Sequence, residues 1–271
     1  NSTTITEAKA PPSESANYVV VERRGNAGLI TLNRPKALNA LSLSMVRDLT
    51  AALTELQADP AVMLVAIRGS NKVGRPGSSD ALFGGFSAGG DIRYFHQAVL
   101  ANDSSLDDFF TEEYQLNHLI HQYPKPFVAF MDGVVMGGGM GISQGASLRI
   151  VTEHTRMAMP ETNIGLFPDV GGGYFLSRCP GHVGEYLALT GDVIGADEAL
   201  QYGLADVKMD AARMPAVWAA MGTQAFSNIT EAKSWLVSEV GQPDAALIQP
   251  DSHIDGFFSL LRVKHMVDAL A

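Results

Sequence analysis

Short apolar stretches recur along the chain, and most of them are rich in valine and isoleucine. They comprise residues 18–23, 28–32, 62–67, 127–131 and 148–151. Stretches of this length and composition predict β-strands. Turn residues at 24–26 separate the first two, so we expect these to form a hairpin. The later stretches are apolar throughout, which predicts strands of a largely parallel sheet that is covered on both faces.

Helical spacing of apolar residues appears between these strands. Ser42 or Ser44 can cap a helix in which residues 45, 46, 49, 53 and 56 are apolar. Residues 106–122 predict another helix, and the pattern beyond Gly171 is mostly helical. Residues 71–90 are dense in glycine and serine and predict a long loop. Strands that alternate with helices predict an α/β fold.

The chain shows neither internal repeats nor an evident linker. We therefore expect a flexible N-terminal segment over residues 1–17 and one core over residues 18–210. A helical C-terminal part would follow over residues 211–271, and we expect it to be incomplete.

The net charge of −10 over 271 residues argues against nucleic acid or an anionic membrane surface as the main partner. Basic residues nevertheless gather locally, at Arg23, Arg24, Arg34 and Lys36. They form either a solvated patch or the contact for an anionic ligand. Cys179 is the single cysteine, which excludes an intrachain disulfide and favours a buried structural thiol. No apolar stretch of about 18 residues is present to span a membrane.

Three familiar patterns carry little weight. Residues 85–89 match G-x-S-x-G, but the nucleophile elbow of a serine hydrolase must follow a strand, and Ser87 follows a loop-like segment. His253 and His265 come after it without a distinctive context. The glycine runs do not fit the dinucleotide-binding spacing. His118 and His121 lack a third ligand nearby, so we expect no metal site.

Two glycine-containing loops are better placed for chemistry. Stabilising a thioester oxyanion requires two converging backbone N–H groups, and backbone approaches a ligand closely only where side chains are small. Residues 87–91 (SAGGD) and 136–139 (MGGG) meet that requirement, and the second opens a predicted helix. Each run alone could also be a tight turn.

Two carboxylates lie eight residues apart downstream of the second loop. Glu161 follows Met159-Pro160, and Asp169 precedes three glycines. Both acids have apolar surroundings in the sequence, which would perturb their protonation. Glu161 could instead be a first-turn helix acid, and Asp169 an N-cap.

Four motifs together resemble the crotonase (enoyl-CoA hydratase/isomerase) superfamily in order and spacing. They are LNRPKALNAL at 32–41, SAGGD at 87–91, GGG at 137–139 and PE at 160–161. The resemblance spans residues 18–209. It implies a spiral of repeated ββα units with a helical C-terminal part. It also implies an acyl-CoA substrate, no separate cofactor, and a homo-oligomer of the trimer type.

The resemblance also implies roles for individual residues. The coenzyme A moiety would contact Arg34, Lys36, Ala37 and Leu38. The amides of Ala88 and Gly138 would form the oxyanion hole. Gly137 and Asp91 would lie at the substrate.

The subfamily is suggested by two departures from the hydratases. Hydratases carry a glutamate two residues after the glycine triplet, where this chain has Gly141. The segment MPETNIGLFPDVGGGYFL at 159–176 is close to that of 3-hydroxyisobutyryl-CoA hydrolases. There the acids matching Glu161 and Asp169 carry thioester hydrolysis, and the one matching Glu113 contacts the substrate.

We therefore expect hydrolysis of a short branched 3-hydroxyacyl-CoA, 3-hydroxyisobutyryl-CoA of valine catabolism in the first place. An enoyl-CoA hydratase or isomerase is the alternative within the same fold. A hydrolase based on Ser87 and a coenzyme A-ester binder without turnover are weaker alternatives. The expected location is the cytoplasm, or the mitochondrial matrix in a eukaryote.

Overall fold

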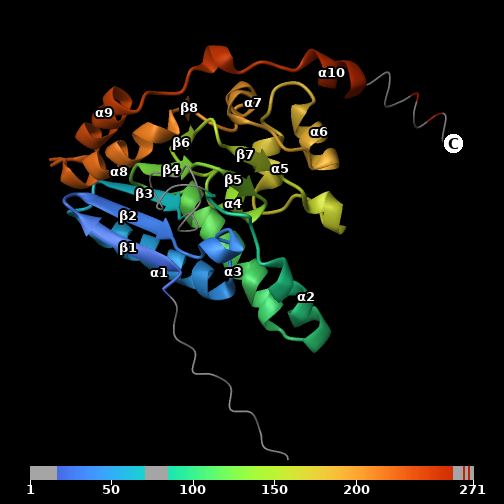
Figure 1. Cartoon of the computed structure of the whole chain (residues 1–271), viewed down its shortest axis with the longest axis horizontal. Coiled ribbons are helices and arrows are strands. Elements are labelled where there is room, and N and C mark those ends of the chain that lie inside the picture. The colour runs from blue at the N-terminus through green and yellow to red at the C-terminus, as the bar shows by residue number, and fades with distance from the viewer. Residues whose placement is uncertain (1–16, 71–84, 259–264, 266–267, 269–271) are drawn as a thin grey trace, which may run out of the picture.

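A six-stranded sheet is the centre of the computed structural model, which describes residues 17–70, 85–258, 265 and 268 (Figure 1). The strand order among these residues is β1-β2-β3-β4-β6-β8. The strands are β1 (Val19–Arg24), β2 (Ala27–Leu32), β3 (Leu64–Gly69), β4 (Phe127–Met131), β6 (Leu148–Val151) and β8 (Val207–Lys208). Two further strands, β5 (Val134–Met136) and β7 (Arg156–Ala158), pair in parallel beside it.

The predicted hairpin and the predicted parallel sheet are both confirmed. β1 pairs antiparallel with β2, and Val19 lies opposite Leu32. All other neighbours in the large sheet run parallel. Parallel strands need crossover connections, and the predicted helices supply them.

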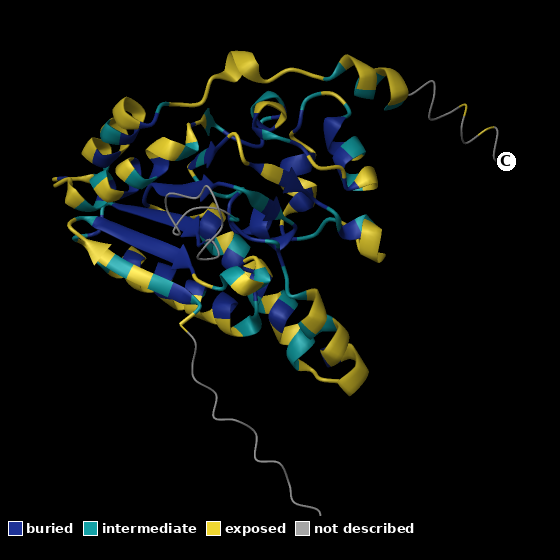
Figure 2. Cartoon of the chain, viewed as in Figure 1, coloured by how far each residue is buried: buried dark blue, intermediate teal, exposed yellow. Residues whose placement is uncertain are grey.

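Both faces of strands β2, β3 and β4 are buried, which explains their continuous apolar sequences (Figure 2). Successive residues alternate between two cores: Val65 and Ile67 of β3 enter one, and Leu64 and Ala66 enter the other. The first core contains residues of α1 (Leu43–Ala58) and α3 (Ser105–His121). The second contains residues of α8 (Met214–Thr223) and α9 (Ile229–Glu239), including Trp218.

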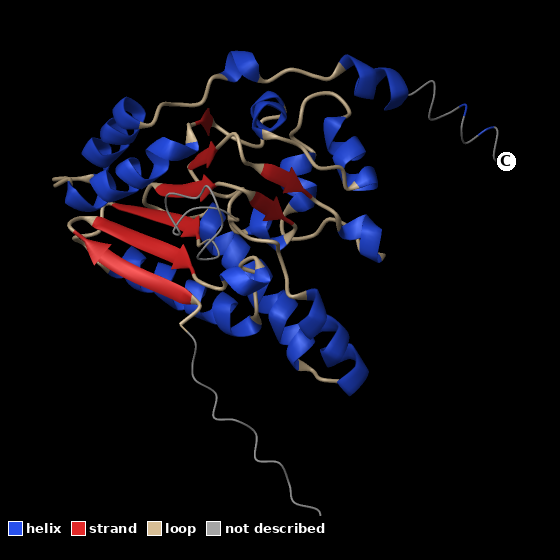
Figure 3. Cartoon of the chain, viewed as in Figure 1, coloured by secondary structure: helices blue, strands red, loops and turns tan. Residues whose placement is uncertain are grey.

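The helices surround the sheets on several sides (Figure 3). Of the two candidate caps, Ser42 and Ser44, the structure uses Ser42, whose Oγ accepts a hydrogen bond from the Met45 amide at 3.3 Å. The remaining helical elements are η1 (Pro35–Ala37), α2 (Ile92–Ala101), α4 (Gly138–Gly141), η2 (Glu161–Ile164), α5 (Gly172–Leu176), α6 (Val183–Thr190), α7 (Ala196–Gln201), η3 (Ala211–Arg213), η4 (Ala245–Leu247) and α10 (Ser252–Phe258). None of the helices in the described ranges has the length and apolarity needed to cross a membrane.

The structure adds elements that the sequence did not predict. Helix α2 begins after Asp91, whose Oδ1 accepts a hydrogen bond from the Tyr94 amide. β5 and β7 have three residues each, too short for a pattern to show. Within the expected long loop, residues 71–84 lie outside the described residues. So does nearly all of the expected flexible N-terminal segment. The regular elements described after β8 are all helical, as predicted.

Candidate active site

A cavity of about 200 Å³ lies where the two glycine loops meet α3 and the segment after β7. Six of the predicted site residues line it: Ala88, Glu113, Gly137, Gly138, Glu161 and Asp169. Apolar side chains such as Phe95 and Phe110 complete the wall. The other five predicted residues, Arg34, Lys36, Ala37, Leu38 and Asp91, do not line this cavity.

The three carboxyl groups of the cavity come from separate parts of the fold. Glu113 projects from the buried side of α3. Glu161 opens η2, directly after the short strand β7 has brought the chain past the glycine triplet. Asp169 lies in the loop that leads into α5. Tertiary packing, rather than one local motif, therefore assembles the acids.

The glycine triplet is tightly bracketed by two of these acids. An ideal Cβ on Gly137 would lie 2.6 Å from Oε1 of Glu161, and Gly137 has a positive φ of 51°. An ideal Cβ on Gly138 would lie 2.6 Å from Oε1 of Glu113. Side chains at either position would displace an acid, so glycine is required there.

The backbone amides around the triplet differ in their availability. The Ala88 N–H donates to the carbonyl oxygen of Leu38 at 3.0 Å. The Gly138 N–H opens α4, where helical N–H groups have no intrahelical acceptor. Among the described residues, the Gly90 N–H has no acceptor either, and its nitrogen lies 3.3 Å from an ideal Cβ on Gly138. We therefore propose Gly90, in place of Ala88, as the partner of Gly138 in an oxyanion hole.

Burial perturbs two of the acids strongly. Desolvation, reinforced by the charges of Asp169 and Glu161, raises the pKa of Glu113 to about 8. Desolvation and the charge of Asp169 raise the pKa of Glu161 to about 7, against a hydrogen bond from its own backbone that lowers it. One oxygen of each group, Oε1 of Glu113 and Oε2 of Glu161, has no hydrogen-bond partner among the described residues. Such unpartnered buried oxygens are available to a ligand.

Asp169 is held by a neighbouring hydroxyl. Tyr114 directly follows Glu113 on α3, and its hydroxyl donates a hydrogen bond to Oδ2 of Asp169 at 2.7 Å. Burial, together with this hydrogen bond and the charge of Asp169, raises the pKa of the Tyr114 phenol. Tyr114 therefore stays protonated and fixes the position of Oδ2 of Asp169 at the edge of the cavity.

Glu113 should make the folded protein less stable as the pH rises. The unfolded carboxyl titrates near its ordinary pKa of about 4.3, whereas the folded one titrates near 8, so stability falls across that interval. Glu113→Gln removes the titration and should raise the free energy of unfolding at pH 9 by roughly 5 kcal/mol. At pH 5 the two proteins should agree within about 1 kcal/mol. Urea unfolding at both pH values measures this, with exposed Glu55→Gln as the control. Equal stabilities at pH 9 would contradict the raised pKa.

The segment predicted to contact coenzyme A, residues 34–38 with the residues that follow it, lies against the glycine loop at 87–91. Besides the Ala88–Leu38 hydrogen bond, the Leu41 N–H donates to the Gly89 carbonyl at 2.7 Å. Arg34 and Asp91, both predicted to contact the ligand, instead form an ion pair with each other at 2.7 Å. Lys36 is exposed, and no ion pair is found for it in the described part of the chain. Of the two basic residues, Lys36 is the one free to meet a phosphate.

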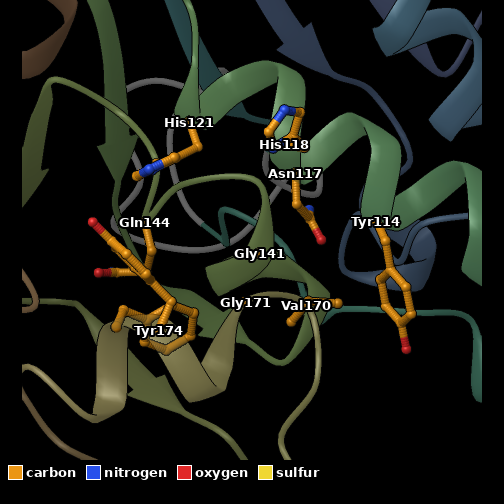
Figure 4. Close-up of a pocket in the computed structure, with 11 residues that line it drawn as sticks. Tyr114, Asn117, His118, His121, Gly141, Gln144, Val170, Gly171 and Tyr174 are labelled. Atoms are coloured by element: carbon orange, nitrogen blue, oxygen red, sulfur yellow. The ribbon is translucent and has the colours of Figure 1, made fainter.

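The structure also bears on the weaker candidates. Ser87 is fully buried, its Oγ donates to the Asn39 carbonyl at 2.9 Å, and no histidine lines the cavity. Its proton is thus already donated to a backbone carbonyl, and no histidine base is found beside it within the described residues. His118 and His121 line a different cavity, shown in Figure 4. No cluster of three or more metal-ligating side chains is found within the described residues.

Sequence reasoning missed three parts of the site. The Gly90 amide and the Tyr114 hydroxyl are recognisable only once their partners are known. The third, Val170, follows Asp169 and lines the cavity with a positive φ of 43°. Its sequence context, next to three glycines, hints at a turn but not at this conformation.

The sequence profile of the enoyl-CoA hydratase/isomerase family matches residues 27–271, most of the chain. The chain belongs to the crotonase (enoyl-CoA hydratase/isomerase) family. Solved structures agree with this crotonase membership. A carnitinyl-CoA dehydratase from Mycobacterium thermoresistibile is 33% identical with a TM-score of 0.76, and the match covers 93% of this chain and 70% of that one. An enoyl-CoA hydratase from Rhodobacter sphaeroides is 35% identical with a TM-score of 0.73 over the same shares. The predicted crotonase fold is thus confirmed.

Among curated crotonase relatives, the chain is similar to proteins named mitochondrial 3-hydroxyisobutyryl-CoA hydrolase. The one from Xenopus tropicalis is 47% identical over 198 residues, which cover 73% of this chain and 49% of the relative. The one from Danio rerio is 40% identical over 243 residues, which cover 90% and 58%. The chain spans about half the length of the curated relatives that it matches.

Proposed function

We propose that this crotonase hydrolyses the coenzyme A thioester of a short branched 3-hydroxy acid, with 3-hydroxyisobutyryl-CoA as the best candidate. The observation that carries the proposal is the cavity in which Glu113, Glu161 and Asp169 face the amides of Gly90 and Gly138. Relatives named 3-hydroxyisobutyryl-CoA hydrolase, at 40–47% identity, support the choice of acyl group.

The chemistry assigns one task to each group. The thioester oxygen would accept hydrogen bonds from the two amides as negative charge develops on it, and each such donor typically contributes about 3 kcal/mol. The carboxylate of Glu161 either attacks the carbonyl carbon or removes a proton from a water that does. In the first route the C–S bond breaks and coenzyme A leaves as its thiolate. Water then cleaves the acyl–Glu161 anhydride, which restores the Glu161 carboxylate, and the proton released with the acid product converts the thiolate to the thiol.

The other two acids would manage the substrate. Glu113, which burial keeps protonated near neutral pH, is positioned as a hydrogen-bond donor to the acyl group. Asp169, held by Tyr114, would position the substrate hydroxyl or accept a proton. Both roles need a dry cavity, and the aromatic wall of Phe95 and Phe110 favours one.

A hydratase or isomerase is the second candidate, because the two solved structures with 33–35% identity carry dehydratase and hydratase names. Incubating the protein separately with 3-hydroxyisobutyryl-CoA and with crotonyl-CoA distinguishes the alternatives. Release of free thiol from the first substrate supports the hydrolase. Loss of enoyl absorbance from the second without thiol release favours the hydratase. Binding of both without turnover identifies a coenzyme A-ester binder.

Lys36→Ala should raise KM for the coenzyme A ester about 3- to 10-fold and leave kcat nearly unchanged. The contact of this exposed lysine with a phosphate would be the same in the ground state and the transition state. A short thioester that lacks the nucleotide provides the control, since its KM should not change. Equal effects on both substrates would remove Lys36 from the coenzyme A contact.

Location, pathway and assembly follow from the same proposal. The names of the curated relatives include the word mitochondrial, which supports the mitochondrial matrix if the source is a eukaryote. A role in valine breakdown would follow from 3-hydroxyisobutyryl-CoA as substrate. A homo-oligomer of the trimer type remains a prediction, and size-exclusion chromatography with light scattering tests it.

A further inference from the structure

Asn39 lies fully buried where three segments of the chain meet. Its backbone φ is 54°, in the left-handed region that residues with a side chain adopt rarely. Asparagine is one of the few residue types enriched there, so the conformation is tolerable at this position. The chemistry proposed above gives Asn39 no task, and a buried polar residue of this kind calls for one.

Every hydrogen-bonding position of the Asn39 side-chain amide is occupied. Its Nδ2 donates to the carbonyl oxygens of Ser70 at 3.0 Å and Gly85 at 2.8 Å. Its Oδ1 accepts from the Arg34 N–H at 2.8 Å and from the Ser70 hydroxyl at 3.3 Å. An amide side chain offers two donors and two acceptor lone pairs, so this network fixes its orientation completely.

The partners of the amide come from separate parts of the fold. Arg34 lies in the segment predicted to contact coenzyme A, and Ser70 directly follows strand β3. Gly85 precedes the glycine loop at 87–91 by two residues. One side chain therefore fixes the end of a buried strand and the start of the glycine loop relative to each other.

The carbonyl group of Asn39 holds the glycine loop as well. Oγ of Ser87 donates to this carbonyl at 2.9 Å and accepts from the Gly89 N–H at 3.2 Å. Gly89 has a φ of 89°, a conformation that favours glycine and turns the chain at this point. The turn of the loop is thus tied to Asn39 through the hydroxyl of Ser87.

The residues that follow form a short parallel pairing with the loop. The Leu41 N–H donates to the Gly89 carbonyl at 2.7 Å, and the Leu41 carbonyl accepts from the Asp91 N–H at 3.0 Å. Gly90 lies opposite Leu41 in this bridge. Because its two neighbours make both bonds, the Gly90 N–H points away from Leu41, and Gly90 lines the candidate active-site cavity.

We infer that Asn39 is a positioning residue for the oxyanion site, where its side chain and carbonyl hold the glycine loop so that the Gly90 N–H meets the substrate carbonyl. Asn39 itself does not line the cavity. One oxyanion donor typically supplies about 10²–10³-fold in kcat, and a displaced donor loses part of that. This inference deepens the proposed function, and its statement about hydrolysis depends on that function.

Asn39→Gly should lower kcat for thiol release about 10- to 100-fold and leave KM within about 3-fold. Glycine adopts a φ of 54° without strain, so the variant removes the amide and spares the backbone. Asn102→Gly is the matched control. Asn102 has a φ of 51°, is exposed and ends helix α2, so this variant should keep kcat within about 2-fold.

The infrared spectrum of a bound ligand gives a readout that a loss of stability alone does not move. The ligand is an acetyl-coenzyme A analogue with an isotope-labelled carbonyl and a methylene group in place of the thioester sulfur. It can be neither hydrolysed nor hydrated. Oxyanion-hole hydrogen bonds polarise its carbonyl and lower the stretching frequency on binding. The native protein and Asn102→Gly should show this shift, and Asn39→Gly should lose at least half of it with the ligand still bound.

Asn39→Asp keeps the test decisive if Asn39→Gly does not fold. Aspartate has the same shape and also tolerates the left-handed region, but its acid group donates at most one of the two bonds that Nδ2 makes. Both losses should appear to a smaller extent. A folded Asn39 variant with the native carbonyl frequency would overturn the inference. A raised KM with unchanged kcat would overturn it too, and would assign Asn39 to coenzyme A binding.

Failure of the proposed function gives a different result. If the native protein releases no thiol from 3-hydroxyisobutyryl-CoA, while the analogue shows the shift and Asn39→Gly loses it, the hydrolase proposal fails and the positioning role stands. If the native protein hydrolyses the ester and Asn39→Gly keeps both the rate and the carbonyl shift, the function stands and the role of Asn39 is wrong.

Discussion

Glu161→Gln should lower kcat for thioester hydrolysis by about 10²–10⁴-fold and leave the fold unchanged. Glutamine keeps the shape of the side chain but cannot attack the thioester or accept a proton from water. Glu161 is buried against the glycine triplet, with one oxygen unpartnered, which places it next to the proposed oxyanion site. Rates of thiol release at saturating substrate measure the effect, with Glu55→Gln as an exposed control.

The pH dependence provides a second, independent readout for Glu161. Because burial raises its pKa to about 7, the reactive carboxylate is scarce at pH 6 and predominates above pH 8. The native kcat/KM should therefore rise with pH through an apparent pKa near 7. The residual activity of Glu161→Gln should lack this acidic limb. Near-normal hydrolysis by the folded variant would show that another group makes or breaks the bond.

Asp169→Asn should lower kcat by about 10²–10³-fold, a fall typical of losing a group that handles protons. Asparagine can still accept the hydrogen bond from Tyr114, so the loop should stay in place while the negative charge is lost. The charge of Asp169 raises the pKa values of both Glu113 and Glu161. Its removal should therefore move the acidic limb of the remaining activity to lower pH.

The pH shift distinguishes a chemical role of Asp169 from a structural one. Tyr114→Phe removes only the hydrogen bond that holds Asp169, and it should lower kcat about 10-fold, a loss of roughly 1.4 kcal/mol, with a smaller pH shift. A harmless Asp169→Asn would leave the oxyanion proposal intact and favour the hydratase alternative. A large fall without any pH shift would place Asp169 too far from Glu161 to interact.

The sheet could be predicted from the sequence because the burial of each strand appears directly in its own residues. Strands such as β3 are covered on both faces, and a run of apolar residues records that directly. The cap and apolar spacing of α1 are equally local. Helix α2 was missed although apolar residues recur in it at helical spacing, at 94, 95 and 98, so the sequence did carry a signal for this helix.

The acidic residues of the site could be predicted from the sequence, but the backbone amides that face the cavity could not. Glu161 and Asp169 could be recognised by residue type and spacing. The choice between Ala88 and Gly90 depends on which N–H is already bonded, and the Leu38 carbonyl that decides it lies fifty residues earlier in the chain. The left-handed backbone of Val170 lies where this residue packs against Gly141, a tertiary contact that no local pattern records.

The close approach of Val170 to Gly141 also bears on how variants of this chain could be selected. The Cβ of any side chain at 141 would lie 2.7 Å from the Cβ of Val170, so a residue other than glycine there requires the loop after Asp169 to move. A laboratory library that varies position 141 alone should therefore yield few folded members. A library that varies positions 141 and 169–171 together should yield more.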